Sequence, residues 1–152
     1  MLWWKKASES GSPEAAYNVG IMYLAGEGVV PDEKQAVLWL RRAADQGSIP
    51  AAAQLGPMAL SSKGGLAPGD ESTRWLKVAA DAGDATAMLD LGMVLFHGLG
   101  AKPDFVEAYK WFALVAQRGS IDGGTGLRPK MTSAQVAEAE RRASGWSVRH
   151  RQ

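Results

Sequence analysis

Cysteine is absent from this sequence, which excludes a disulfide framework, thiolate catalysis and cysteine-based zinc or iron–sulfur sites. Neither charge is in excess, because 17 Lys and Arg residues against 16 Asp and Glu residues leave a net charge of +1. A nearly neutral chain has no overall basic field, so we predict no nucleic-acid partner. No apolar run reaches the roughly 18 residues that a membrane span needs.

The first residues also lack the features of a signal peptide. Met1 to Lys6 contain neither an apolar segment of about 7–15 residues nor a small-residue cleavage site. For the chain as given, this and the lack of cysteine favour the cytoplasm. A periplasmic or secreted location stays open if a precursor segment carries the signal, because a cysteine-free chain can work in either compartment.

Catalytic motifs are missing as well. The sequence contains no phosphate-binding Gly-x-x-x-x-Gly-Lys-Ser/Thr, no Gly-x-Ser-x-Gly, no His-Glu-x-x-His and no Ser-x-x-Lys pattern. Gly26-x-Gly28 and Gly98-x-Gly100 lack a third glycine and follow predicted helices rather than strands, so we interpret them as structural turns. We therefore predict no catalytic residue and no enzyme.

Metal ligands are few. The only two histidines are His97 and His150, whereas a metal site needs three or four ligands that converge. Asp90 and Asp104 lie within reach of His97, but no spacing requires them to meet there. We predict neither a metal nor another cofactor.

What the sequence does contain is a repeat. Trp3, Trp39, Trp75 and Trp111 each lie 36 residues after the one before. The same step separates two further sets of residues, Gly11, Gly47, Gly83 and Gly119, and Gly20, Gly56 and Gly92. A fixed period between 20 and 50 residues is the signature of a stacked-repeat protein. With 152 residues of ordinary globular composition, we expect one domain over 1–152.

Each unit reads as a pair of helices separated by a glycine-containing turn. The boundaries that we predict are a half repeat at 2–11 and full repeats at 13–47, 49–83 and 85–119. Asp32 and Asp104 are expected to cap the second helices of two units. Glycines within the first helices allow another helix to approach closely, and each tryptophan is expected to fill the space between helix pairs.

Two regions depart from the pattern. Pro57 stands inside a first helix, which it should kink or shorten, and the loop from Ser61 to Gly69 is expected to be loose and polar. After Gly119 the glycines at 123, 124 and 126 argue against another first helix. A last amphipathic helix, with a capping box of Thr132 and Gln135, is predicted to form a C-terminal cap over 131–147.

The 36-residue unit resembles the Sel1-like repeat, a relative of the 34-residue tetratricopeptide repeat. In the first unit the resemblance is carried by Ala16, Val19, Gly20, Tyr23, Gly26, Gly28, Val29, Asp32, Ala36, Trp39, Ala43, Ala44 and Gly47. The third unit matches at Leu91, Gly92, Gly98, Gly100, Asp104, Ala108, Trp111, Ala116 and Gly119. The resemblance implies an all-α fold, a right-handed α–α superhelix (solenoid) of helix-turn-helix repeats. Similar proteins act as adaptors and scaffolds, often in bacteria, and share no catalytic residues.

The expected binding site is the concave face that the first helices line in such solenoids. Positions of these helices that point off the packing face are Tyr17, Asn18, Ile21, Leu24, Gln54, Leu60, Leu89, Asp90, Met93, Phe96 and His97. Residues of one register form rows, of which two are apolar. Either these rows are buried against neighbouring helices, or they form a methionine-containing groove for a peptide or a partner helix.

Two functions from different classes remain open at this point. The first is a non-enzymatic adaptor that binds a protein or peptide partner in the concave groove. The alternative is a structural unit that assembles with itself, as a homo-oligomer, through its repeat ends. A basic end, with Arg141, Arg142, Arg149 and Arg151, either attracts an acidic partner or is a solvated face of the cap.

Overall fold

The computed structural model describes residues 6, 11–100, 102–119 and 128–150, and every regular element within them is a helix. The predicted all-α class is therefore confirmed. The α-helices are α2 (Pro13–Ala25), α3 (Glu33–Asp45), α4 (Ile49–Leu60), α5 (Asp70–Asp81), α6 (Ala85–His97), α7 (Phe105–Gln117) and α8 (Ser133–Arg149). Two short 3-10 helices, η1 (Lys63–Gly65) and η2 (Arg128–Lys130), lie between them.

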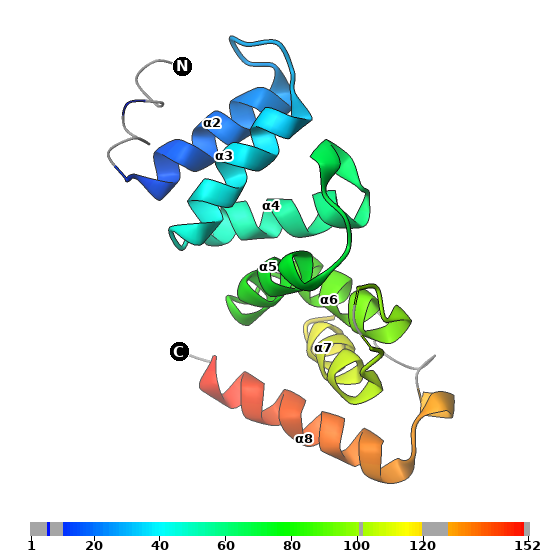
Figure 1. Cartoon of the computed structure of the whole chain (residues 1–152). Coiled ribbons are helices and arrows are strands. Elements are labelled where there is room, and N and C mark those ends of the chain that lie inside the picture. Colours follow the sequence, from blue (N-terminus) through cyan, green and yellow to red (C-terminus); the bar gives the residue numbers. More distant parts are fainter. Residues whose placement is uncertain (1–5, 7–10, 101, 120–127, 151–152) are drawn as a thin grey trace.

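In the described part of the chain, the α-helices form three successive pairs, α2 with α3, α4 with α5 and α6 with α7, followed by the single helix α8. From α2 to α8, each α-helix packs against the next one along the chain, and α4 also contacts α6. In Figure 1 the pairs follow one another from α2 and α3 at the top to α8 at the bottom. Contacts between neighbouring units, rather than around one central core, are what defines a solenoid.

The helix ends follow the predicted cap residues. The Asp32 carboxylate accepts hydrogen bonds from the backbone N–H groups of Lys34 and Gln35 at 2.9 and 3.1 Å. Asp104 likewise accepts from the N–H of Glu107 at 3.0 Å. At the other end of α2, Gly26 adopts a φ of +74°, which favours glycine. The predicted caps are confirmed at Asp32 and Asp104.

Glycines within the first helices let the two helices of a pair approach closely, as predicted. A Cβ atom at Gly56 would lie 2.2 Å from Cδ2 of Leu76, and one at Gly20 would lie 2.8 Å from Cγ of Leu40. Both leucines are fully buried. Any larger residue at these two positions would therefore push the paired helices apart.

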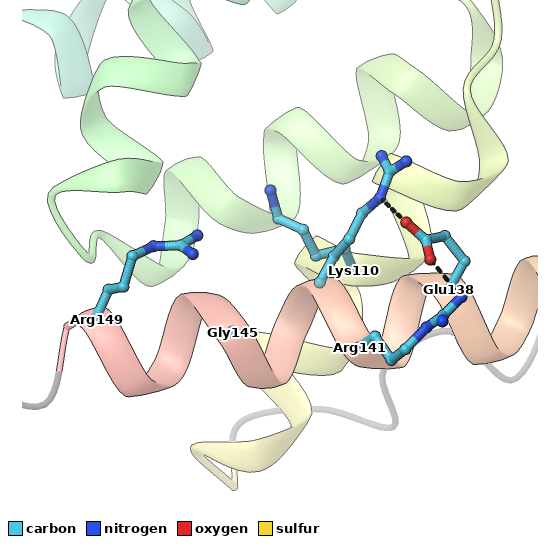
Figure 2. A pocket seen from close by; sticks show the side chains of 6 residues that line it. Lys110, Glu138, Arg141, Gly145 and Arg149 are labelled. Atoms are coloured by element: carbon cyan, nitrogen blue, oxygen red, sulfur yellow. Dashed lines mark hydrogen bonds and ion pairs between the residues drawn. The ribbon is translucent and has the colours of Figure 1, made fainter.

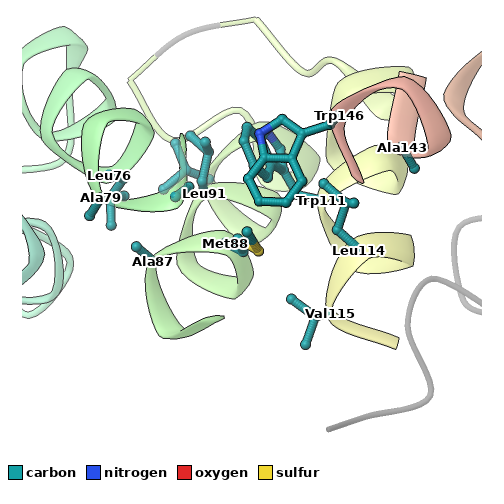
Figure 3. Packing of buried hydrophobic residues seen from close by; sticks show 12 residues of the cluster. Leu76, Ala79, Ala87, Met88, Leu91, Trp111, Leu114, Val115, Ala143 and Trp146 are labelled. Atoms are coloured by element: carbon teal, nitrogen blue, oxygen red, sulfur yellow. The ribbon is translucent and has the colours of Figure 1, made fainter. Parts of the chain in front are cut away.

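The tryptophans differ in how far they fill the space between helix pairs, which was predicted for each of them. Trp75 and Trp111 are 3% and 0% exposed and lie in two separate cores, as predicted. We call these the N-terminal core, formed by α2 to α5, and the C-terminal core, formed by α5 to α8 and drawn in Figure 3. Trp39 is half-buried and packs against the N-terminal core, so it fills the space between the helices only in part.

The predictions for the second unit are partly wrong. The first of its helices, α4, continues through Pro57 to Leu60 and is one residue shorter than α2, with 12 residues against 13. The loop that follows is not loose, because Leu66 in it is 5% exposed and belongs to the N-terminal core. Val30, at the same register of the first unit, is 83% exposed.

The physical reason for this ordered loop lies in η1. This short helix packs against α3, where the backbone N–H of Gly64 donates to the Glu33 carboxylate at 3.3 Å. A Cβ at Gly64 would lie 2.5 Å from Cγ2 of Val37, so the approach depends on glycine. Leu66 then reaches the core as an apolar anchor that the first unit lacks.

The C-terminal helix begins as predicted and extends further than predicted. Thr132 and Gln135 exchange the two hydrogen bonds of a capping box, and Ala139 and Trp146 are buried on the inner side of α8. The helix ends at Arg149, and the His150 ring stacks on Trp146 with centroids 4.0 Å apart. The half repeat 2–11, apart from residues 6 and 11, and the glycine-rich segment 121–126 lie outside the described residues.

Candidate functional site

The predicted binding residues lie on α2, α4 and α6 and in no case in the fully buried core. We call them together the first-helix face. Exposed members are Gln54, Met93 and His97. Half-buried members are Tyr17, Asn18, Ile21, Leu24, Leu60, Leu89, Asp90 and Phe96. The two alternatives for the apolar rows were burial against neighbouring helices and an open groove. The structure is intermediate, because these side chains pack against the cores but remain partly accessible to solvent.

The anchoring differs along the face. Tyr17, Ile21 and Leu24 pack against the N-terminal core, and Leu60 and Leu89 pack against the C-terminal core. Beyond them, the ring of Phe96 rests against the ring of Phe105 with centroids 5.9 Å apart. Met93 is 47% exposed, which makes it the most exposed apolar residue of this face.

Polar members accompany the apolar ones. Asn18, Gln54 and Asp90 occupy one register of the three first helices. Partial burial raises the pKa of the Asp90 carboxyl, and the nearby negative charge of Asp84 raises it further. The His97 ring meets the ring of Phe96 edge-on, with centroids 4.7 Å apart. No group of three metal-ligating side chains is present in the part of the chain that the structure describes.

A second feature is a basic hollow of about 450 Å³ between α7 and α8. We call it the cap hollow; it is lined by Lys110, Glu138, Arg141, Arg142, Gly145 and Arg149. Figure 2 shows Lys110 and Arg149 on the same side of α8. The sequence predicted three of these arginines as a basic end, with Arg151, which lies outside the described residues. The sequence did not indicate Lys110, because this residue lies on α7 and joins the arginines of α8 only when the two helices pack together.

Two carboxylates neutralise part of the cap hollow. Glu138 accepts from Arg141 at 2.6 Å and from Nε of Arg142 at 2.9 Å. Its pKa is lowered, first by the hydrogen bond from Arg142 and then by the charge of Arg141. Glu107 pairs with Lys110 and, at 3.2 Å, with Arg142.

A third feature is a more apolar hollow of about 590 Å³ on α3, lined by Leu38, Trp39, Arg41, Arg42, Asp45 and Gln46. Leu38 is 61% exposed. The next two units have charged residues, Arg74 and Lys110, at the same register, so an exposed apolar side chain here is particular to the first unit. Sequence reasoning missed this α3 hollow, and the register difference at Leu38 is the signal that could have revealed it. None of the residues lining the cap hollow or the α3 hollow belongs to the first-helix face.

Comparison with known proteins agrees with this architecture. A family model described as Sel1 repeat matches residues 1–12, 13–48, 49–84 and 85–120. Comparison with curated proteins gives no match. Among the helices of the described residues, none is both long enough and apolar enough to cross a membrane.

Two solved structures are similar over almost the whole chain. One is a protective antigen present in uropathogenic Escherichia coli strains that displays an SLR fold, with a TM-score of 0.76 and 29% identity over 96% of this chain. The other is a Sel1 repeat protein from Oxalobacter formigenes, with a TM-score of 0.74 and 26% identity over 97% of this chain. The chain spans 32% of the first protein and 63% of the second.

Proposed function

This chain belongs to the Sel1 repeat family, and from that premise we propose a non-enzymatic interaction module whose first-helix face binds an apolar peptide or a partner helix. Sel1 repeat proteins generally mediate protein–protein interactions, and the family is typically non-catalytic. The family thus supports a protein partner. The choice of face rests on the side chains of α2, α4 and α6.

The observation that carries the proposal is the alignment of accessible apolar side chains across the three first helices. Ile21, Pro57 and Met93 share one register, and each is half-buried or exposed. Leu24, Leu60 and Phe96 share a second register and are all half-buried. The two rows support a continuous apolar strip, and an amphipathic helix presents complementary anchors at i, i+3, i+4 and i+7.

Met93 is the residue of this strip that we expect to make the main contact with a partner. Its unbranched thioether side chain adapts to different shapes, which is why methionine is common on surfaces that bind apolar partners. The neighbouring polar row of Asn18, Gln54 and Asp90 supplies hydrogen-bonding groups that fix the orientation of a ligand. An apolar strip beside a polar row matches the two sides of an amphipathic segment.

Affinity capture with a matched pair of variants tests the proposal. Met93→Asp places a charge on the first-helix face, and Val78→Asp places the same charge on α5 at a similarly exposed position, 44% against 47%. We expect one bound protein to be retained by the wild type and by Val78→Asp and lost by Met93→Asp. Circular dichroism must show both variants folded. If Met93→Asp retains every protein that the wild type retains, this face is not the binding site.

The α3 hollow favours a second candidate function, self-assembly. Leu38 and Trp39 offer apolar surface beside two charged residues of α3, Arg41, which pairs with Glu71, and Asp45, which pairs with Arg74. A second copy of the chain could cover this apolar surface. Light scattering at increasing concentration should then show a dimer that Leu38→Asp dissociates. A constant monomer mass for the wild type would exclude this alternative.

A further inference from the structure

We propose that the cap hollow between α7 and α8 binds an extended acidic segment of a partner protein, through that segment's carboxylate side chains. This is a second interaction surface, separate from the first-helix face. It takes a ligand of opposite character, charged rather than apolar. Three features of the hollow favour such a ligand: its net positive charge, the N–H donors of its arginines that have no partner in the described part of the chain, and Gly145.

Positive charge exceeds negative charge around the cap hollow. Lys110, Arg141, Arg142 and Arg149 carry four positive charges around one hollow, and Glu138 and Glu107 supply two negative charges. The difference of +2 exceeds the +1 of the entire chain. Local potential is therefore concentrated here, where it can attract an acidic ligand.

The arginines of the cap hollow keep N–H donors that have no partner among the residues that the structure describes. Arg141 uses only Nη2 in its ion pair with Glu138, and Arg142 uses Nε and Nη1 in its own pairs. Within the described residues, the side chain of Arg149 makes neither a hydrogen bond nor an ion pair. Guanidinium groups prefer carboxylates, which they bind through two parallel hydrogen bonds. The existing carboxylates thus orient the arginines without using all of their N–H groups.

Gly145 leaves open space on the side of α8 that lines the hollow. A Cβ atom at this position would meet only Nη1 of Arg149, at 3.8 Å. The helical glycines of the pairs are different, because a Cβ at Gly92 would lie 2.7 Å from the ring of Phe112. Glycine within a helix is less favourable than alanine. Close packing against Phe112 accounts for the glycine at position 92. No such packing accounts for Gly145, and we infer that the open space there admits the backbone of a ligand that approaches α8.

The shape of the hollow selects among anions. From Glu138 to Arg149 the helix rises over eleven residues, which is about 16 Å at 1.5 Å per residue. An extended peptide of about five residues has this length. A single phosphate group is far too small to contact all four cations. We infer that a peptide with acidic side chains at alternate positions fits better than a free anion.

Fluorescence anisotropy with a defined peptide tests the proposal. The probe is a labelled hexapeptide with glutamate at alternate positions, and its counterpart carries glutamine instead. Arg149→Glu and Lys77→Glu change the net charge equally, but Lys77 is exposed on α5, outside the hollow. We expect the glutamate peptide to bind, more weakly at high salt, and Arg149→Glu to weaken binding about tenfold. Lys77→Glu should change it less than about twofold.

A second variant tests the shape rather than the charge. Gly145→Gln fills the floor of the hollow and should also weaken binding, while circular dichroism shows that α8 is retained. Equal binding of the glutamine peptide, or equal losses in Arg149→Glu and Lys77→Glu, would overturn the proposal. So would displacement by equimolar inorganic phosphate, which indicates a free-anion site. Arg149-dependent binding to phosphatidylserine vesicles without peptide binding would indicate a membrane surface instead.

Discussion

The indole rings of Trp111 and Trp146 meet edge to face, with centroids 6.1 Å apart and planes inclined by 70° (Figure 3). Trp146 lies on α8, outside the 36-residue series, yet it covers the last tryptophan of that series. Such aromatic pairs contribute about 0.5–1.5 kcal/mol beyond the burial of their area. The C-terminal helix therefore closes the solenoid with the same residue type that fills its interior.

This relationship predicts unequal costs for the tryptophans. Trp111→Ala should lower the free energy of unfolding by about 3–5 kcal/mol, because the ring is fully buried. Trp39→Ala should cost about 1–2 kcal/mol, because that ring is only half-buried. Urea denaturation of the two variants measures both values. Equal losses would contradict the burial that the structure assigns to Trp39.

Two glycine substitutions separate helix propensity from packing. Gly56→Ala and Gly145→Ala gain the same preference of alanine for a helix, about 1 kcal/mol. Gly56→Ala also forces a Cβ against the buried Leu76, which costs about 1–3 kcal/mol. Thermal unfolding should therefore show Gly145→Ala to be more stable than the wild type and Gly56→Ala to be less stable than Gly145→Ala. A stabilised Gly56→Ala would mean that the helices of this pair are less tightly packed than described.

The ordered loop of the second unit predicts a contrast between two residues of one register. Leu66→Ala should cost about 2–5 kcal/mol, because a core side chain is removed. Val30→Ala, at an 83% exposed position, should stay within about 0.5 kcal/mol of the wild type. Guanidinium denaturation compares them. A negligible effect of Leu66→Ala on stability would mean that the loop is loose, as the sequence predicted, and that Leu66 does not anchor it in the core.

The raised pKa of Asp90 predicts a pH-dependent stability. A carboxyl whose pKa is higher in the folded state holds more protons there, so it destabilises the fold once it ionises. The effect develops between the ordinary aspartate pKa and the raised one, and is complete at neutral pH. Asp90→Asn should therefore raise the melting temperature at about pH 7 and leave it unchanged at about pH 3. A lower melting temperature at neutral pH would show that the charge is stabilising instead.

Much of the fold could be predicted because its signals are local or periodic. The 36-residue step of the tryptophans, the caps at Asp32 and Asp104 and the box of Thr132 and Gln135 each depend on residues close in the sequence. Hydrogen bonds at helix ends follow from such short spacings. The pattern of a repeat then extends one unit to the next.

Features that depend on packing between units could not be predicted in this way. Leu66 occupies a turn position, and nothing local distinguishes its burial from the exposure of Val30. The extent to which Met93 and Phe96 are covered depends on how the first helices lie against one another. Lys110 joins the cap hollow only because α8 lies along α7. The 36-residue register thus predicted which residues share a helix face, but it did not predict how deeply each of them is buried.

Site-specific photo-crosslinking from position 93 tests the central claim most directly, because it reports contact between the first-helix face and a partner. A photoreactive phenylalanine analogue would replace Met93 in one variant and Val78 in another, since both positions are similarly exposed. On irradiation with the captured partner, we predict a crosslinked product from position 93 and none from position 78. A product from position 78 alone, or equal products from both, would contradict binding through the first-helix face.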